Sequence, residues 1–288
     1  MKGIIMAGGN GSRLYPMTKS VNKHLLPIYD KPMIYYPLSV LMLMDITEIV
    51  IITNEYDIDD FNNLLGDGSH LGIKINFLIQ KEPNGIAEAF IISKNFIGNE
   101  QVCLILGDNI FYGNGISHIL KRQKETLDGA CIFAYPVLDP KRYGIINLND
   151  KEEPVSINEK PENPESDLAI TGLYFYNNDV INIAKNNVKS NRGELEISSI
   201  NQNYLENKRL NVEIMGRGLT WFDAGTPKSL MESSQFVQSI ESRQGFKIAC
   251  IEEIAYRKKW ILKEQLIKTI SKLGDTSYSD YLNKILKI

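Results

Sequence analysis

An apolar run that ends in a glycine-rich turn, at the start of the chain, is the feature that most restricts the fold. Residues 4–6 (Ile-Ile-Met) predict a buried strand, and three glycines follow it within residues 8–11. Glycine has no Cβ, so backbone amides in such a turn can approach a bulky anion closely. Arg13 and Lys23 add two cations, the first of them planar and permanently charged. The stretch therefore predicts a strand followed by a phosphate-binding loop.

Two familiar phosphate-binding loops do not match this stretch. The dinucleotide-binding pattern needs a third glycine three positions after Gly11, where the chain has Leu14. A Walker loop ends in Gly-Lys-Ser or Gly-Lys-Thr, which is also missing from the stretch. The glycine spacing thus disfavours a dinucleotide-dependent oxidoreductase. A tight turn with two solvated cations remains the plain alternative.

The composition suits one large α/β body and does not suggest nucleic acid as a partner. The 288 residues are 43% hydrophobic, which is enough for a substantial core. Charges nearly balance, with 32 basic and 35 acidic residues and a net charge of −3. Because there is no basic excess, no nucleic-acid partner is expected, and local cations must hold any phosphate ligand.

Cysteine usage and hydropathy indicate a cytoplasmic protein that makes no membrane contact. The three cysteines, Cys103, Cys131 and Cys250, lie far apart in apolar runs, which favours core positions in a reducing compartment. Glycines interrupt the N-terminal apolar run at once, unlike in a signal peptide. No apolar stretch approaches the ~20 residues of a membrane helix.

Strand-like and helix-like patterns alternate through the first half of the chain. Buried strands are predicted at 4–6, 48–53, 74–79 and 102–106, with helices at 33–44, 57–65 and 86–95. Nearly continuous apolar strands separated by helices predict a Rossmann-like, mostly parallel sheet covered on both faces. Ligands of such sheets lie beyond the carboxyl ends of the strands, where the glycine turn and Asp108 fall.

The second half adds antiparallel strands and then helices. Strands are predicted at 130–137, 143–148, 155–158, 170–176 and 210–215, and helices at 179–187, 197–206 and 226–242, before a mostly helical C-terminal stretch. We therefore predict an α/β fold with a mixed sheet, an antiparallel addition and a helical C-terminal part. It forms a single domain, 1–288, divided into 1–130, 131–225 and 226–288.

Three polar positions outside the glycine turn suit chemistry, each with a plain alternative. The Gln80 amide suits the imide edge of a pyrimidine, although the following residues, up to Gly85, also read as an ordinary turn. Asp108 lies at the tip of a predicted strand, just after Gly107, where it suits a hard cation or hydrogen-bonds its own turn. Lys160 precedes a proline, which predicts an extended backbone, and is either a phosphate contact or a solvated charge.

Two stretches resemble a known family. Ala-Gly-Gly-Asn-Gly-Ser-Arg-Leu at 7–14 is similar to the signature of the sugar-phosphate nucleotidyltransferases. The stretch 25–37, Leu-Leu-Pro-Ile-Tyr-Asp-Lys-Pro-Met-Ile-Tyr-Tyr-Pro, most resembles the glucose-1-phosphate thymidylyltransferase group of that family. The similarity continues in blocks almost to the C-terminus. The chain departs from the usual pattern at His24, Ile86 and Ala224, where relatives more often carry Gln, Leu and Thr.

The resemblance implies roles for individual residues. Arg13, Lys23 and Lys160 would be catalytic, and Asp108 and Asp223 would together hold Mg²⁺, a pairing that spacing alone cannot supply. The nucleotide would be bound by Gly8, Gly9, Gly11, Ser12, Arg13, Lys23, Gln80, Gly85 and Asp108. The sugar phosphate would be bound by Asn109, Tyr143, Gly144, Glu159, Lys160, Thr171, Gly172, Tyr174 and Arg192.

The implied reaction joins dTTP and α-D-glucose 1-phosphate to give dTDP-glucose and pyrophosphate, the first step toward dTDP-L-rhamnose and related deoxysugars. The resemblance also implies a homotetramer with feedback inhibition by dTDP-L-rhamnose, and residues 243–256 match relatives in that region. Two other functions stay open: transfer from UTP or to another sugar 1-phosphate, and a catalytically silent nucleotide-sugar sensor.

Overall fold

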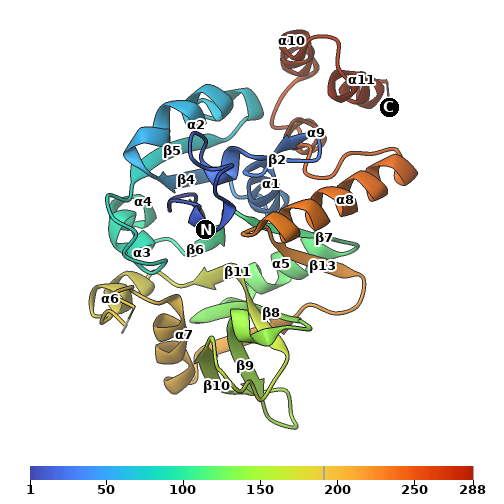
Figure 1. Cartoon of the computed structure of the whole chain (residues 1–288). Coiled ribbons are helices and arrows are strands. Elements are labelled where there is room, and N and C mark those ends of the chain that lie inside the picture. Colours follow the sequence, from blue (N-terminus) through green and yellow to red (C-terminus); the bar gives the residue numbers. More distant parts are fainter. Residues whose placement is uncertain (191, 288) are drawn as a thin grey trace.

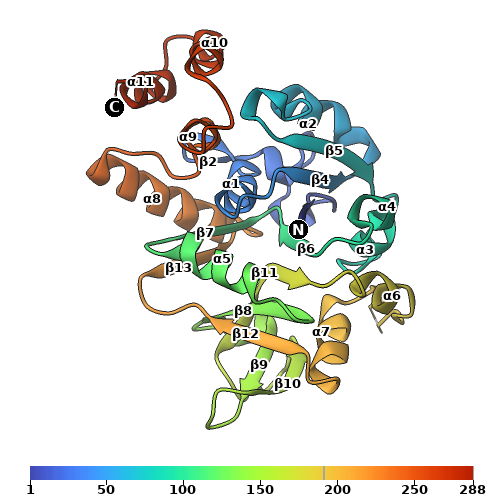
Figure 2. The same cartoon turned by 180° about the vertical axis from the view of Figure 1, so that it is seen from behind.

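A computed structural model describes residues 1–190 and 192–287 and has the predicted α/β architecture (Figures 1 and 2). Its main sheet follows the order β10-β9-β11-β6-β1-β4-β5, with β8 pairing with β11 and β12 with β8. The parallel strands are β1 (Lys2–Met6), β4 (Glu48–Thr53), β5 (Lys74–Ile79) and β6 (Val102–Leu106). The prediction of a mostly parallel mixed sheet is confirmed.

Side chains on the two faces of this sheet enter different cores. Ile5 of β1 packs into a cluster with α1 (Tyr35–Leu43), α2 (Ile58–Leu65), α5 (Ile116–Glu125) and α9 (Ile251–Arg257). Its neighbour Ile4 packs on the opposite face with α3 (Glu88–Ile92), α6 (Val180–Lys185) and α7 (Ile197–Glu206). Because successive strand residues point to opposite faces, the apolar run of β1 reflects burial on both sides.

The expected antiparallel addition extends the sheet beyond β6. It consists of β8 (Ala130–Pro136), β9 (Gly144–Leu148), β10 (Pro154–Glu159) and β11 (Leu168–Tyr176), with β12 (Leu210–Ile214) parallel to β8. β11 pairs antiparallel with β6, and so joins the addition to the parallel part. The strands β9 and β10 lie at the opposite end of the molecule from the C-terminal helices (Figures 1 and 2).

The sequence patterns missed several elements and misjudged one helix. β7 (Asn109–Gly113) and β13 (Leu219–Asp223) form a separate antiparallel ribbon, β2 (Pro27–Ile28) and β3 (Lys31–Pro32) form another, and α5 was not predicted. The continuous helix predicted at 86–95 is wrong. Ser93 separates α3 from α4 (Lys94–Ile97), because its φ of −92° and ψ of 10° depart from helical geometry, although its amide and its hydroxyl both donate to the Ala89 carbonyl, over 3.0 and 2.6 Å.

The C-terminal part is helical, as predicted. It comprises α8 (Pro227–Gln244), α9, α10 (Lys263–Leu273) and α11 (Ser277–Ile285). Thr226 begins α8 with a capping box, since its hydroxyl accepts from the Ser229 amide and the Ser229 hydroxyl accepts from the Thr226 amide. In residues 1–190 and 192–287, none of the helices has the length and apolarity that crossing a membrane requires.

Candidate active site

Two cavities adjoin at the carboxyl edge of the parallel strands. The larger, of about 640 Å³, takes lining residues from the loops after β1, β4 and β5, including Gly9, Asn54 and Gln80. The smaller, of about 430 Å³, lies between the loop after β6 and the antiparallel addition. Lys23 lines the larger cavity and Asp108 the smaller, and their side chains are 2.5 Å apart. The two cavities therefore meet at this ion pair.

The glycine turn after β1 forms one wall of the larger cavity. Gly9 and Gly11 have positive φ angles of 93° and 57°, and Gly11 leads into a short 3₁₀ helix at Ser12–Leu14. The Thr18 hydroxyl donates to the Gly11 carbonyl over 2.7 Å and so closes the turn. A side chain at Gly11 would come within 3.1 to 3.3 Å of Thr18 and Lys23, and its φ also favours glycine. The turn geometry thus accounts for this glycine.

The ion pair between Lys23 and Asp108 is largely shielded from solvent, with 14% and 10% of the two side chains exposed. Burial acts to raise the pKa of the Asp108 carboxyl, but the Lys23 ammonium and the amide of Asn109 outweigh it and hold that pKa well below its ordinary value. Asp108 is therefore a carboxylate at neutral pH, and Lys23 neutralises part of its charge.

The ribbon of β7 and β13 brings the second carboxylate to Asp108. Asp223 is paired with Asn109 in the ribbon, and the Ala224 amide donates to the Asp108 carbonyl over 2.9 Å. Burial, and then the charge of Asp108, raise the pKa of Asp223 above its ordinary value. The two acidic residues, distant in sequence, therefore act on each other electrostatically.

The carboxylates of Asp108 and Asp223 fit a hard divalent ion. Both line the smaller cavity, and burial followed by the charge of Asp108 raises the pKa of Asp223 despite the nearby Arg13, Lys23 and Arg142. Mg²⁺ is commonly held by one or two carboxylates together with substrate phosphates. In the described residues no group of three His, Cys, Asp or Glu side chains is placed to hold a metal ion.

Arg13 and Arg142 lie beside Asp223. A Cβ on Gly225 would stand 2.9 Å from Nη2 of Arg13 and 2.8 Å from Oδ1 of Asp223, so the guanidinium and the carboxylate approach the same glycine. Nη2 of Arg142 lies 3.8 Å from Oδ2 of Asp223. Arg142 begins the stretch that precedes β9 but was not among the predicted site residues. Arg142 is recognised as a site residue by its pairing with Asp223, and this pairing cannot be seen in the sequence.

Asn109 holds three strands of the site together. It is buried, its Oδ1 accepts from the Trp221 indole N–H over 2.6 Å and from the Gly172 amide over 2.9 Å, and its Nδ2 donates to Asp108 over 3.0 Å. These bonds join β7 to β13 and to β11. Sequence reasoning treated Asn109 as a sugar contact only and missed its partner Trp221.

The predicted sugar-phosphate residues Glu159, Lys160 and Arg192 lie together in the smaller cavity. Nη2 of Arg192 donates to Glu159 over 3.1 Å and to Glu196 over 2.9 Å, and its Nε donates to Glu196 over 3.1 Å. Burial acts to lower the pKa of Arg192, but Glu196 outweighs it, so the net shift is upward. The Arg192 cation is thus already paired with carboxylates.

The extended backbone predicted at Lys160 is wrong. Lys160 has φ of +46°, in the left-handed region, and its amide donates to the Tyr143 carbonyl over 3.1 Å. The chain turns sharply here because β10 ends at Glu159, and the turn overrides the preference imposed by the following proline. A non-glycine residue with positive φ is strained, and such strain concentrates at functional sites.

Gln80 and Gly85 lie close together after β5. Nε2 of Gln80 donates to the Gly85 carbonyl over 3.2 Å and to Glu88 over 2.8 Å. Gly85 has φ of 106°, and a Cβ there would come within 2.5 Å of the Leu195 carbonyl. Close packing against Leu195 therefore requires a glycine at this position, whatever else its backbone binds.

The structure gathers most of the predicted site residues. The smaller cavity is lined by Arg13, Asp108, Asn109, Tyr143, Gly144, Glu159, Lys160, Gly172, Tyr174, Arg192 and Asp223, and the larger by Gly9, Lys23 and Gln80. Gly8, Gly11, Ser12, Gly85 and Thr171 are not lining residues of either. Thr171 alternates along β11 with Ile170 and Gly172, which do line the cavity, so its side chain points to the other face of the strand.

Across the described ranges 1–190 and 192–287, no cysteine or histidine is among the lining residues of the two cavities. Cys103, Cys131 and Cys250 are buried and unpaired, as predicted for core residues. His24 is also buried, and its Nδ1 lies 2.9 Å from Oδ1 of Asn22. Burial, and to a lesser extent the charge of Lys23, lower the pKa of His24 to about 3. The imidazole is therefore neutral at physiological pH.

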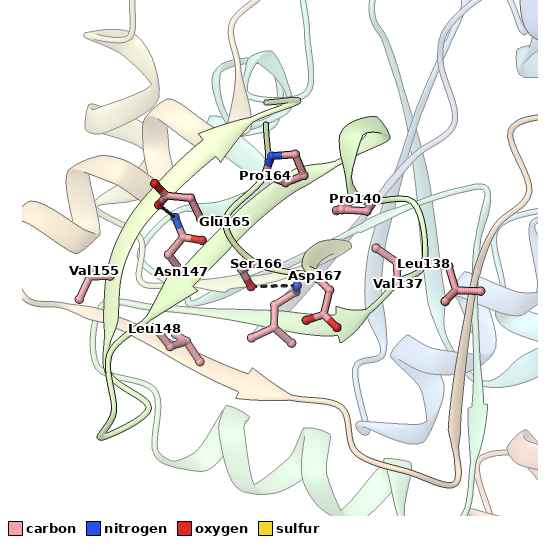
Figure 3. Close-up of a pocket in the computed structure, with 11 residues that line it drawn as sticks. Val137, Leu138, Pro140, Asn147, Leu148, Val155, Pro164, Glu165, Ser166 and Asp167 are labelled. Carbon is pink, nitrogen blue, oxygen red and sulfur yellow. Dashed lines mark hydrogen bonds between the residues drawn. The ribbon is translucent and has the colours of Figure 1, made fainter. Parts of the chain in front are cut away.

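A third cavity, of about 860 Å³, is larger than the other two but chemically different (Figure 3). It lies in the antiparallel addition and is lined by Val137, Leu138, Pro140, Asn147, Leu148, Val155, Pro164, Glu165, Ser166, Asp167 and Leu168. None of these described residues is cationic, and Glu165 and Asp167 are acidic. Such a cavity repels phosphate, whereas the paired cavities carry lysines and arginines.

A carboxyl-edge cavity pair with cations, two carboxylates and an α/β sheet is the arrangement of a nucleotidyl transferase. The family model described as Nucleotidyl transferase matches residues 2–240, and the chain belongs to this family. Its full-length relatives narrow the group to the glucose-1-phosphate thymidylyltransferases. The relative from Neisseria meningitidis is 52% identical over all of both chains, and that from Mycobacterium tuberculosis is 48% identical over 100% of this chain and 99% of its own.

Solved structures support the same fold. A crystal structure described as a glucose-1-phosphate thymidylyltransferase from Bacillus anthracis, in complex with a sucrose, is 40% identical with a TM-score of 0.76, covering 82% of this chain and 94% of its own. A UDP-glucose pyrophosphorylase complexed with UDP-glucose has a TM-score of 0.73 at 23% identity and shows the fold alone; it covers 83% of this chain and 98% of its own.

Proposed function

We propose that the protein joins dTTP and α-D-glucose 1-phosphate to give dTDP-glucose and pyrophosphate. The observation that carries this proposal is the meeting of the two cavities at the pair Lys23 and Asp108, beside Arg13 and Asp223. The larger cavity takes the nucleotide and the smaller one the sugar phosphate, so the reacting phosphates meet at the ion pair. The curated relatives named glucose-1-phosphate thymidylyltransferase support this choice of substrates.

The chemistry needs charge neutralisation more than proton transfer. The nucleophile is a phosphate oxygen whose second pKa is about 6, so it is mostly ionised at neutral pH. No general base is required, which agrees with a neutral, buried His24. A dianion must instead approach a tetra-anion, and fixed positive groups and correct positioning lower that barrier.

The fixed groups divide this work. Arg13 and the amides of the glycine loop stabilise the departing pyrophosphate, and Lys23 faces the phosphates from the nucleotide side. Lys160 and Arg192 aim the sugar phosphate for in-line attack, without a covalent enzyme intermediate. Asp108 and Asp223 would hold Mg²⁺, which would supply positive charge to phosphate oxygens. Gln80 and Gly85 bind the thymine, and the other predicted residues of the smaller cavity bind the sugar hydroxyls.

A pyrophosphate-release assay tests the proposal. The enzyme is mixed with Mg²⁺ and with dTTP, UTP or dCTP, each paired with glucose 1-phosphate, galactose 1-phosphate or mannose 1-phosphate. Fastest release with dTTP and glucose 1-phosphate is expected. Faster release with UTP or with another sugar phosphate would show that the proposed substrates are wrong and would identify the preferred pair. No release from any pair would favour a silent nucleotide-sugar sensor.

The family resemblance carries three further proposals. The protein is a cytoplasmic homotetramer, dTDP-L-rhamnose inhibits it at a subunit interface that includes residues 243–256, and the product enters dTDP-rhamnose and polysaccharide synthesis. Within the single domain 1–288, residues 1–130 mainly bind the nucleotide, 131–225 the sugar, and 226–288 form the helical part. Light scattering tests the assembly. The pyrophosphate-release assay with and without dTDP-L-rhamnose tests the inhibition.

A further inference from the structure

A chain of polar side chains ends at Gln80 on the wall of the nucleotide cavity. Nζ of Lys189 donates to Oδ1 of Asn84 over 2.7 Å, and Nδ2 of Asn84 donates to Oε1 of Glu88 over 2.9 Å. The other carboxylate oxygen of Glu88 accepts from Nε2 of Gln80 over 2.8 Å. The four residues come from the loop after β5, from α3 and from the segment after α6.

The chemistry of this chain permits only one orientation of the Gln80 amide. The carboxylate of Glu88 and the carbonyl of Gly85 are both pure acceptors, so the NH₂ group of Gln80 must face them. Lys189 is a pure donor, which fixes the Asn84 amide in the same way. The orientation of the Gln80 amide therefore follows from its two acceptors, the Glu88 carboxylate and the Gly85 carbonyl.

This orientation turns the carbonyl oxygen of Gln80 toward the nucleotide loop. A Cβ built on Gly8 would lie 3.0 Å from Oε1 of Gln80, and Gln80 lines the larger cavity. Gln80 itself is only 5% exposed. Within the described residues, no donor is bonded to this oxygen, whereas both hydrogens of the amide nitrogen have acceptors. Gln80 thus presents its carbonyl oxygen, a hydrogen-bond acceptor, to the cavity. Its NH₂ group, the donor, is held away by Glu88 and Gly85.

We propose that Glu88 is a positioning residue for base selection, which holds the Gln80 amide so that the site accepts a base with a ring N–H and rejects cytosine. Thymine and uracil carry a hydrogen at N3, which the Gln80 oxygen accepts. Cytosine has an unprotonated N3, which would face that oxygen as a second acceptor and leave both unpaired. This inference rests on the proposed function, because it takes the larger cavity as the nucleotide site.

The test compares kcat/KM for dTTP, UTP and dCTP in the wild type, Glu88→Gln and Glu88→Ala. A glutamine at 88 can present either its oxygen or its NH₂ to Gln80, and alanine presents neither, so in both variants only the longer bond to the Gly85 carbonyl still opposes turning over of the Gln80 amide. The dTTP to dCTP ratio of kcat/KM should fall by roughly tenfold, within the usual value of one discriminating hydrogen bond. The dTTP to UTP ratio should change less than about twofold, because both bases carry N3–H.

Controls separate this inference from the proposed function. Glu232→Gln, on the exposed face of α8 and 3.8 Å from Lys228, makes the same chemical change away from the cavities and should leave every ratio unchanged. Calorimetric titration with dTTP and dCTP gives the same comparison without turnover. If the wild type does not prefer dTTP to dCTP, the proposed function fails. If the wild type prefers dTTP to dCTP, two results would overturn the positioning role of Glu88. One is an unchanged dTTP to dCTP ratio of kcat/KM in both Glu88 variants, and the other is an equal fall of kcat/KM for all three nucleotides.

Discussion

The ammonium of Lys23 lies 2.5 Å from the carboxylate of Asp108, and this pair forms the boundary between the two cavities. Lys23 comes from a 3₁₀ turn near the N-terminus and Asp108 from the end of β6, 85 positions later in the chain. In the proposed reaction, a group placed at this boundary would contact phosphates from both substrates. The pair also neutralises a buried carboxylate, so it serves stability as well as the proposed chemistry.

Lys23→Met should therefore reduce stability and activity together, while Lys23→Met combined with Asp108→Asn should restore only stability. The single change leaves a buried carboxylate without its partner, which costs about 3–5 kcal/mol of unfolding free energy. The double change removes both charges and should recover most of that loss, although turnover stays at least ~100-fold below the wild type. Urea unfolding and pyrophosphate release measure the two quantities. Recovery of turnover in the double variant would contradict the proposed role of both groups.

Arg13→Ala should lower kcat by at least ~100-fold, the usual loss for one charge-stabilising donor. The guanidinium stands at Gly225, beside Asp223, and in the proposed reaction it stabilises the departing pyrophosphate. Arg209→Ala is a matched control, because Arg209 pairs with Asp179 at 2.6 Å outside both cavities. Steady-state rates at saturating substrates measure the effect, and near-normal turnover of the Arg13 variant would remove it from the mechanism.

Lys160→Ala should mainly raise KM for glucose 1-phosphate. The Lys160 amine lies 3.8 Å from Glu159 and is about half exposed, so substrate phosphate can compete with this loose pair. Because Lys160 also has a positive φ, Lys160→Gly removes the amine while relieving the backbone. Both variants should show the same rise in KM, and the glycine variant should unfold at the higher temperature. An unchanged KM in both would exclude Lys160 from the sugar-phosphate site.

The strands of the parallel sheet were predictable because each is a nearly continuous run of apolar residues in the sequence. The predicted ranges 48–53, 74–79 and 102–106 match β4, β5 and β6, since continuous apolar runs are typical of strands covered on both faces. The same local signal located the glycine turn and Asp108 at the carboxyl edge. It could not show the break at Ser93, where the backbone leaves helical geometry at a single residue, with φ of −92° and ψ of 10°.

The partner of Asp108 was not predictable from local pattern. Asp223 reaches it through the ribbon of β7 and β13, two short strands that pair with each other and not with the main sheet. Nothing in the residues around Asp223 specifies that pairing, and only the family resemblance connected the two carboxylates. The same holds for Trp221 and Arg142, whose roles appear only when the ribbon is formed.

Gly172→Ala should disturb the site from within. A Cβ at this position would stand 2.6 Å from Oδ1 of Asn109 and 2.7 Å from Cγ of Leu106, so Asn109 must shift. Overpacking of this kind costs about 1–3 kcal/mol. It should also weaken the bonds from Asn109 to Trp221 and Asp108 and lower kcat. Thermal unfolding and turnover test both effects, and a variant with unchanged melting temperature and unchanged kcat would show that β11 accommodates the methyl group freely.

His24→Gln should make the protein less sensitive to mild acid. The pKa of His24 is about 3 in the folded chain against 6.5 for an ordinary histidine, because burial disfavours the imidazolium. Below pH 6.5 the unfolded chain binds a proton that the folded chain excludes, so the unfolding free energy falls as the pH drops toward 3. Between pH 7.5 and 5 this loss is about 2 kcal/mol, and glutamine cannot contribute to it. Urea unfolding of wild type and variant across that range measures the difference, and parallel pH profiles would show that His24 becomes protonated in the folded protein.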